Sequence, residues 1–283
     1  MEIKFNQVGY CYNEQTPLQK EVLKDINIAI IEGKINGIFG KSGSGKTTLV
    51  EMINALLIPT VGHIKVDNYI IEKNKKIVNV NTLRCKVGIV FENPEDQFFN
   101  TTVKKEIEFG MKYFNYKTDK IEDRIIDALK MVGLDETFLE RDPFSLSSGE
   151  KRKVAIASIL TFNPKVIIFD EPTLGLDYNS KVNLIRIIKM LKNKYNKTII
   201  ITTHDVDLLH QLADYIFVLH NKKVVMEGNK NDIFSRVDEL KKYDLPVPKI
   251  IEFANKVYIQ KNIKMGYRDD INDLIKDIYR YVK

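Results

Sequence analysis

The stretch from Gly40 to Thr48 constrains this chain more than any other. It reads Gly-Lys-Ser-Gly-Ser-Gly-Lys-Thr-Thr, follows the apolar run at residues 35–39 and precedes a helical pattern that begins at Leu49. A glycine, four residues and then Gly-Lys-Thr is the spacing of a P-loop, which joins a strand to a helix. Its glycines let backbone N–H groups converge on phosphate oxygens, and the following helix N-terminus adds a partial positive charge. The chain is therefore expected to bind a nucleoside triphosphate.

Every residue of this loop is a candidate for contacting the nucleotide. Lys46 is expected to reach the β- and γ-phosphates, and the Thr47 hydroxyl is expected to bind Mg²⁺. The alternative is a glycine-rich turn with a solvated lysine, which the strand before and the helix after disfavour. The other candidate residues are Gly40, Lys41, Ser42, Gly43, Ser44, Gly45 and Thr48.

Composition adds few constraints. The chain of 283 residues is 44% hydrophobic and 29% charged, as in ordinary globular proteins. It has no apolar run near the roughly 20 residues that span a bilayer, and its first residues lack a signal-peptide pattern. Cys11 and Cys85 lack metal-ligand spacing and indicate reduced cytosolic thiols. The net charge of +6 is compatible with a membrane surface or a nucleic acid but establishes neither, because the lysines are spread along the chain.

Apolar runs typical of strands alternate with helical patterns. Residues 3–8 and 26–30 predict amino-terminal strands, and the runs at 87–91, 165–169 and 198–202 predict buried strands. Strands that alternate with helices argue for a mainly parallel sheet covered on both faces. We therefore expect an α/β fold with an amino-terminal antiparallel β subdomain.

The remaining segments suggest how the chain is divided. Residues 69–81 are polar and predict a surface connection, whereas a helical insertion is expected at about 98–160. We expect a nucleotide-binding domain over 1–230 and a small carboxy-terminal appendage over 231–283. That appendage contains Leu-Pro-Val-Pro at 245–248, and its last part has apolar residues at helical spacing. These residues are Ile271, Leu274, Ile275 and Ile278.

Two acids and a histidine follow predicted strands. Asp170 and Glu171 end the run at 165–169, and His204 follows the run at 198–202, so all three are expected at the sheet edge where open α/β sheets bind ligands. Asp170 suits Mg²⁺, and Glu171 suits a general base for water attacking the γ-phosphate. His204 can bond that phosphate and orient the base or the water. The alternatives are a loop acid pair and a structural histidine.

In order, these motifs match those of ATP-binding cassette (ABC) ATPases, which the chain resembles over about residues 1–230. The discriminating motif is Leu-Ser-Ser-Gly-Glu at 146–150, because many unrelated enzymes share only the P-loop. Leu-Gly-Leu-Asp at 174–177 belongs to the same set. The segments at 91–97 and 108–110 are similar to the ATPase subunits of energy-coupling factor (ECF) transporters, as is the Leu-Pro-Val-Pro tail.

The resemblance implies a P-loop NTPase core that works as a head-to-tail ATP sandwich. Ser147 and the Gly149 N–H group would contact the γ-phosphate of ATP bound to a partner's P-loop. Asp177 would lie at the subunit interface, and Tyr12 would stack on adenine. From the residues alone, Tyr10 or Tyr12 could stack on a base, although a sheet aromatic is the default interpretation.

The resemblance also implies partners, cofactors and a location. Its cofactors would be ATP and Mg²⁺, and the groove beside residues 92–110 would receive coupling helices of a transmembrane scaffold subunit. A second ATPase, identical or homologous, and a membrane substrate-binding subunit for a vitamin or metal ion would complete the complex. The chain would lie peripherally on the cytoplasmic face of the cell membrane and would bind no nucleic acid.

The sequence departs from the family's pattern at three positions. Ser148 stands where glycine is usual and Glu150 where glutamine is usual, which leaves Ser147 and Gly149 in place. Glu92 stands where the family has a glutamine that contacts Mg²⁺. A carboxylate still offers an oxygen to Mg²⁺, but it loses the amide donor and adds a charge.

Two alternative functions use the P-loop differently. A soluble P-loop kinase would give the signature, Asp177 and His204 no role. An ABC ATPase acting on DNA or ribosomes usually carries long coiled-coil insertions or two cassettes. Here about 100 residues separate Lys46 from Ser147, and the chain has a single P-loop motif.

Overall fold

Two β-sheets form the centre of the structure, a computed structural model that describes residues 1–114, 120–261, 275–276 and 279. The strands are β1 (Ile3–Tyr12), β2 (Lys20–Ile26), β3 (Ala29–Ile30), β4 (Ile35–Phe39), β5 (Val61–Val66), β6 (Tyr69–Glu72), β7 (Val87–Val90), β8 (Val166–Asp170), β9 (Thr198–Thr203), β10 (Tyr215–His220) and β11 (Lys223–Asn229). The α-helices are α1 (Lys46–Glu51), α2 (Val80–Lys86), α3 (Val103–Tyr113), α4 (Ile121–Met131), α5 (Ser148–Leu160), α6 (Tyr178–Asn193), α7 (Val206–Leu212), α8 (Lys230–Ser235), α9 (Val237–Lys242) and α10 (Lys249–Lys261). Short 3₁₀ turns are η1 (Pro94–Gln97), η2 (Glu136–Phe138) and η3 (Pro143–Ser145).

The larger sheet is mainly parallel and has the order β11-β10-β4-β9-β8-β7. Its strands from β10 to β7 pair in parallel, and β11 is added antiparallel to β10. In this register Thr202 is opposite both Ile38 and Asp170, so the carboxyl ends of β4, β9 and β8 lie side by side. The predicted α/β class is confirmed, and the sheet order places the loops after these strands at one edge.

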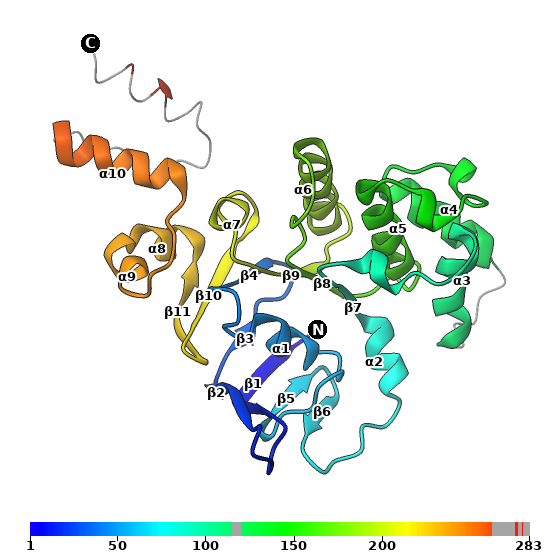
Figure 1. Cartoon of the computed structure of the whole chain (residues 1–283), viewed down its shortest axis with the longest axis horizontal. Helices are drawn as coiled ribbons and strands as arrows, with labels where there is room; N and C mark the ends of the chain where they lie inside the picture. Colours follow the sequence, from blue (N-terminus) through cyan, green and yellow to red (C-terminus); the bar gives the residue numbers. More distant parts are fainter. Residues whose placement is uncertain (115–119, 262–274, 277–278, 280–283) are drawn as a thin grey trace.

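The smaller sheet is antiparallel, with the order β2-β1-β5-β6 and with β3 paired to β1. Helix α1 lies between the two sheets, whereas α6 and α7 cover the opposite face of the parallel sheet (Figure 1). Leu49 and Val50 of this helix are fully buried in one cluster with Ile38 of the parallel sheet and Ile64 of the antiparallel sheet. Burial of four of its six residues explains why so short a helix is stable.

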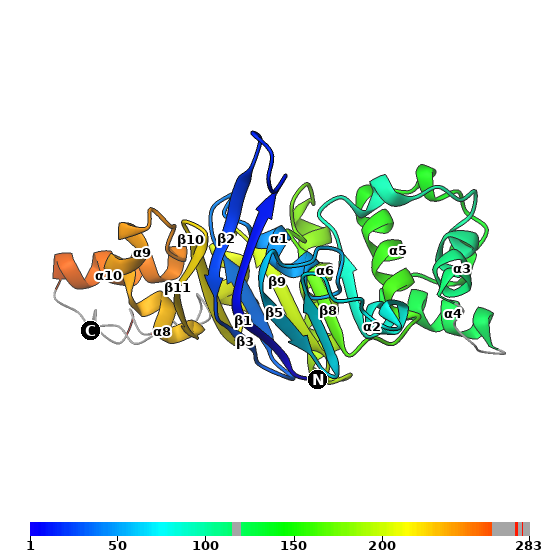
Figure 2. The ribbon, with the colours of Figure 1, turned by 90° about the horizontal axis from the view of Figure 1, so that it is seen from below.

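Helices gather at the two ends of the molecule. Figure 2 shows α3, α4 and α5 together at one end and α8, α9 and α10 at the other. Helix α3 buries Val103, Ile107 and Met111, which are four residues apart and therefore share one face. The Thr102 side chain caps its N-terminus by accepting the Lys105 N–H group.

Two local expectations differ from the structure. The second amino-terminal strand is β2, which ends at Ile26 and pairs with β1, while residues 26–30 contribute only the short β3. The polar segment at 69–81 contains β6 and the start of α2, because Ile71 and Leu83 are buried in the core. Ile271, Leu274 and Ile278 of the predicted tail helix lie outside the described residues.

Over the described ranges, the structure contains no helix with both the length and the apolar character needed to cross a bilayer.

Candidate functional site

The P-loop forms a tight turn between β4 and α1. Gly43 and Gly45 have φ values of 76° and 101°, which residues other than glycine rarely adopt. A Cβ atom on Gly40 would lie 2.4 Å from the Leu219 carbonyl oxygen. The hydroxyl oxygen of Ser44 is buried and has no hydrogen-bond partner among the described residues. A glycine cradle with an unsatisfied hydroxyl at the N-terminus of α1 fits the phosphates of a nucleotide.

Lys46 is buried over this loop. Its Nζ atom donates to the carbonyl oxygens of Gly40 at 3.0 Å and Lys41 at 3.1 Å. The same ammonium lies 3.2 Å from Oε1 of Glu171. The loop, its lysine and the predicted general base therefore form one contiguous cluster, in which the lysine points toward the carboxyl edge of the sheet.

Asp170 is held by hydroxyl groups from two elements. Thr47 at the start of α1 donates to Asp170 Oδ2 at 2.7 Å, and Thr202 at the end of β9 donates to Oδ1. A hydroxyl and a carboxylate are hard oxygen donors that suit Mg²⁺. In the part of the chain that the structure describes, no three His, Cys, Asp or Glu side chains form a metal cluster. The residues fit an ion that keeps phosphate and water ligands, as Mg²⁺ does beside a nucleotide.

Glu171 begins the turn after β8 with a φ of 42°, a strained value for a residue other than glycine. Thr203 donates to its Oε2 atom at 2.9 Å, and His204 places Nδ1 3.0 Å from the same oxygen. The side chain of Glu171 is 11% exposed and that of His204 is 53% exposed. A buried carboxylate is thus oriented by a hydroxyl, an ammonium and an imidazole that reaches solvent, which is an arrangement suited to a positioned base.

Tyr12 lies at the margin of this cluster. Its hydroxyl group is 3.0 Å from the hydroxyl of Thr48, and its ring meets Tyr10 edge-on with centroids 4.8 Å apart. Burial raises the pKa of the Tyr10 phenol. Tyr12 is only half-buried, so its ring remains accessible beside the P-loop helix, where a base attached to bound phosphates would lie.

Ser147 and Glu150 form a capping box at the start of α5. Ser147 accepts the Glu150 N–H group, and Glu150 Oε2 accepts the Ser147 N–H group at 2.9 Å and its hydroxyl at 2.6 Å. These hydrogen bonds from Ser147 lower the pKa of the Glu150 carboxyl. Ser147 nevertheless stays exposed, so the helix N-terminus that it caps faces solvent.

Gly149 packs the start of α5 closely against α6. A Cβ atom there would lie 2.5 Å from the Ser180 hydroxyl oxygen. Ser180 in turn donates to Asp177, which caps α6, through its N–H group at 3.0 Å and its hydroxyl at 2.7 Å. Both hydrogen bonds lower the pKa of Asp177. The signature turn and the start of α6 therefore form a second cluster.

The structure does not bring all predicted site residues together. Among the described residues, no hydrogen bond or ion pair joins Ser147, Gly149 or Asp177 to the P-loop cluster. Within the same ranges, the carboxylate of Glu92 also has no hydrogen bond or ion pair. The Glu92 carbonyl oxygen, however, accepts the guanidinium of Arg152 at 2.5 Å.

Sequence reasoning missed the threonines that hold the acids and the arginine behind Glu92. Thr202 and Thr203 directly precede His204 at the end of β9, so the strand-end argument that selected His204 could also have selected them. No comparable sequence pattern marks Arg152 or Ser180 as part of the site. Lys41 of the P-loop also pairs with Asp244 after α9, a contact between residues 203 positions apart that no local pattern predicts.

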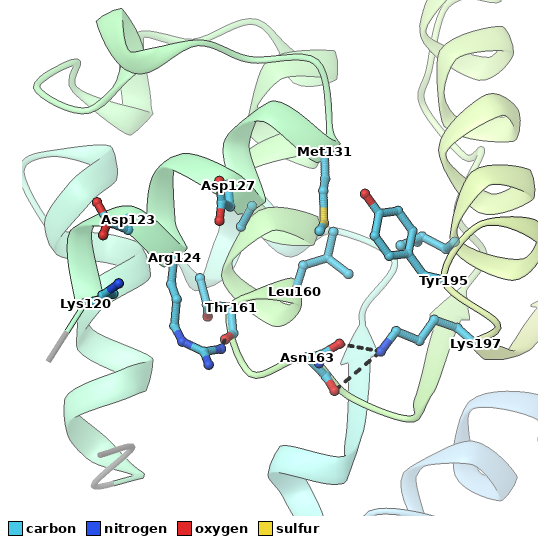
Figure 3. A pocket seen from close by; sticks show the side chains of 12 residues that line it. Lys120, Asp123, Arg124, Asp127, Met131, Leu160, Thr161, Asn163, Tyr195 and Lys197 are labelled. Atoms are coloured by element: carbon cyan, nitrogen blue, oxygen red, sulfur yellow. Dashed lines mark hydrogen bonds between the residues drawn. The ribbon is translucent and has the colours of Figure 1, made fainter. Parts of the chain in front are cut away.

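A separate cavity of about 430 Å³ lies between α4, the end of α5 and the segment after α6 (Figure 3). Lys197 donates there to the side-chain oxygen of Asn163 at 2.5 Å, and burial lowers the pKa of Lys197. Asn163 precedes β8 and Lys197 precedes β9, so the cavity is at the amino ends of these strands. It is therefore on the opposite edge of the sheet from the P-loop and is not part of the nucleotide site.

Comparisons with known proteins agree with this geometry. Residues 23–174 match the ABC transporter family. The chain is 38% identical to the energy-coupling factor transporter ATP-binding protein EcfA2 of Staphylococcus epidermidis, covering 94% of this chain and 91% of that protein. EcfA2 of Clostridium acetobutylicum is also 38% identical, with 99% and 94% covered.

Solved structures show the same similarity. The structure of cbiO1 from Clostridium perfringens, described as part of the ABC transporter complex cbiONQ, has a TM-score of 0.73 and 34% identity and covers 89% of this chain and 98% of that one. A dimeric post-hydrolysis structure of the cassette MJ0796 with ADP and Pi has a TM-score of 0.72 and 28% identity, with 81% and 98% covered.

Proposed function

This chain belongs to the ABC transporter family, and from that premise we propose that it is the ATP-hydrolysing subunit of an energy-coupling factor type transporter. The observation that carries the proposal is the cluster in which Lys46, Thr47, Asp170, Glu171 and His204 meet at one sheet edge. A kinase or a nucleic-acid ATPase would not explain the similarity to EcfA2 proteins over nearly the whole chain.

The geometry supports a separate role for each of these residues at the phosphates. Lys46 and the P-loop amides would neutralise the triphosphate, and Thr47 with Asp170 would hold Mg²⁺, which supplies charge neutralisation when bound. Glu171 would accept a proton from the water that attacks the γ-phosphate. Thr203 and His204 contact the same Glu171 oxygen and would keep the carboxylate aimed at that water.

The signature cluster supports an ATP sandwich made with a second cassette. Ser147 caps an exposed helix N-terminus, a site that suits a phosphate anion, yet no described contact links it to this chain's own P-loop cluster. The dimeric form of the solved cassette MJ0796 fits the same arrangement. We propose that Ser147 and the Gly149 N–H group contact ATP on the partner's P-loop, with Asp177 at the interface.

An exposed aromatic cluster supports a membrane partner beside residues 92–110. Phe99 meets Phe109 edge-on at 4.7 Å between centroids, and Phe109 stacks on Tyr113 at 6.2 Å. All three rings are exposed, by 59%, 46% and 60% respectively. The Glu106 carboxylate accepts the Phe99 N–H group at 3.1 Å and so holds the segment after η1 against α3. Exposed rings on a fixed support are typical of an interface core.

We propose that a coupling helix of a transmembrane scaffold covers these rings. The complete transporter would add a second ATPase and a membrane substrate-binding subunit for a vitamin or metal ion. This chain would then lie peripherally on the cytoplasmic face of the membrane. The name of the cbiONQ complex, to which the similar cbiO1 belongs, supports such an assembly.

Co-purification tests the proposal. The tagged chain is recovered from detergent-solubilised membranes of its own cells, and the bound proteins are identified by mass spectrometry. We expect a second cassette ATPase and at least two polytopic membrane proteins, and we expect the recovered complex to release phosphate from ATP without an added acceptor. Recovery of ribosomes or nucleic acid in their place would contradict the proposal.

A matched pair of variants locates the membrane contact. Phe109→Ser removes a ring of the aromatic cluster and should release the membrane subunits while leaving ATP binding intact. Phe253→Ser is the control, because Phe253 is equally exposed at 46% but lies on α10 at the opposite end of the molecule (Figure 2). Equal recovery of the membrane subunits with both variants would place the contact elsewhere.

A further inference from the structure

Arg152 is a buried cation that joins three parts of the molecule. It lies five residues after Ser147 on α5 and is 4% exposed. One end of its guanidinium donates to the carbonyl oxygens of Glu92 at 2.5 Å and Phe91 at 3.4 Å. The other end donates to the carbonyl oxygen of Leu174 at 3.2 Å. The side chain thus connects the signature helix to the loops that follow β7 and β8.

Both loops follow neighbouring strands at the sheet edge where the nucleotide is proposed to bind. The loop after β7 carries Glu92, which stands in the family's Mg²⁺-contacting position. The loop after β8 begins at Glu171, whose carbonyl oxygen accepts the Leu174 N–H group at 3.2 Å, and it leads to Asp177. Arg152 therefore touches the backbone of the two loops that follow β7 and β8, while its own helix begins at the signature turn.

The planar fork of the guanidinium is what permits these contacts. Its N–H groups diverge at fixed angles, so they can bond carbonyl oxygens on two separate loops at once. A lysine ammonium is a point charge and cannot span both. Because the group is buried, loss of its donors would leave carbonyl oxygens without partners inside the protein.

We propose that Arg152 is a positioning residue that couples the two ATP sites of the sandwich. It fixes the signature turn, which acts on ATP bound to the partner, relative to the Glu92 and Leu174 loops, which follow the strands beside this chain's own catalytic cluster. A shift of either loop on nucleotide or membrane-subunit binding is thereby passed to Ser147 and Gly149. The inference rests on the proposed head-to-tail function and adds a named element that links the sites.

The test isolates hydrolysis at the partner's P-loop. Complexes are assembled with Glu171→Gln in this chain, so that turnover occurs only at the partner's site, and Arg152→Lys is then added. We expect kcat at the partner's site to fall about ten-fold or more, because the signature turn is no longer held. Binding of a fluorescent ATP analogue to this chain's own P-loop should stay within about two-fold. Arg186→Lys on the exposed face of α6 is the matched control and should change neither value.

Two further measurements separate the possible failures. Unchanged kcat with Arg152→Lys, in a complex where Ser147→Arg stops hydrolysis, overturns the Arg152 proposal alone. An unchanged kcat with Ser147→Arg contradicts the head-to-tail arrangement, and therefore also the Arg152 proposal that rests on it. If Arg152→Lys unfolds the protein, hydrogen exchange on the unsubstituted chain tests the coupling instead. The amides of residues 147–150 should gain protection when ATP binds the P-loop of the same chain. No change in their exchange overturns the coupling.

Discussion

The P-loop cluster and the signature cluster, for which we propose the same kind of anion, are built in opposite ways. Around Glu171 the carboxylate oxygens are bonded by Lys46, Thr203 and His204, and the group is nearly inaccessible. Around Ser147 the described hydrogen bonds come from residues within four positions, and the turn faces solvent. The first cluster needs strands from across the sheet, whereas the second needs only the starts of α5 and α6.

This difference supports the proposed origin of the ATP at each cluster. A buried cluster with a phosphate cradle would hold ATP on its own, because all its groups are already in place. An exposed cap with one short-range partner offers N–H groups to an anion brought by another molecule. Substitutions should therefore affect ATP affinity and the rate of ATP hydrolysis differently in the two clusters.

The largest effect is expected inside the buried cluster. Glu171→Gln keeps the shape of the side chain but removes the proton acceptor, so hydrolysis should fall by roughly 10² to 10⁴. ATP affinity should be retained, and ATP-bound dimers should accumulate. Phosphate release by the assembled complex and gel filtration with ATP measure these outcomes. A variant that hydrolyses ATP at the unsubstituted rate would show that Glu171 is not the base.

A substitution in the exposed cluster should lower the rate of ATP hydrolysis without changing the ATP affinity of this chain. Ser147→Arg blocks the helix N-terminus with a bulky side chain, so hydrolysis at the partner's site should fall about 100-fold. Because Ser147 is outside the P-loop cluster, the affinity of the isolated chain for ATP should stay within about two-fold. Equilibrium titration of the isolated chain measures this affinity. A large loss there would contradict the separation of the two clusters.

A substitution of Glu92 should have an intermediate effect. The residue is half-buried, and its backbone carbonyl oxygen is held by Arg152. Glu92→Gln removes one charge at nearly constant volume, which should shift the Mg²⁺ concentration for half-maximal hydrolysis by roughly two- to five-fold. ATPase rate against Mg²⁺ is measured for both forms in the membrane-embedded complex. Superimposable curves with equal transport would place Glu92 outside the metal site.

The smallest effect concerns the capping box. The pKa of Glu150 is lowered in the folded chain, so its ionised form stabilises folding above the ordinary value of 4.5, and this contribution is lost as pH falls through the lower folded pKa. Glu150→Gln should cost about 0.5 kcal/mol of unfolding free energy at pH 7 and close to none in acid. Urea unfolding of both forms at pH 7 and at about pH 2.5 measures the difference. An equal difference at both pH values would contradict the charge argument.

Some features could be predicted because their signals are local. The glycine spacing at 40–48 predicts the P-loop turn, and the aliphatic run before Asp170 predicts a buried strand. Ser147 and Glu150 form the capping box that their three-residue spacing predicts. The β6 strand at Tyr69 was missed because its pairing with β5, and not its polar composition, makes it a strand.

The α/β class, the family and the chemical identity of the candidate acids, base and phosphate cradle can be read from the amino-acid sequence alone. Such motifs are short, and the backbone conformation that each needs is encoded within a few residues. The folded structure was needed to show that Thr202 and Thr203 hold the acids, and that Arg152 binds Glu92 across 60 positions of chain. These partners are selected by strand order and helix packing, because a buried polar group bonds whatever the folded core places beside it.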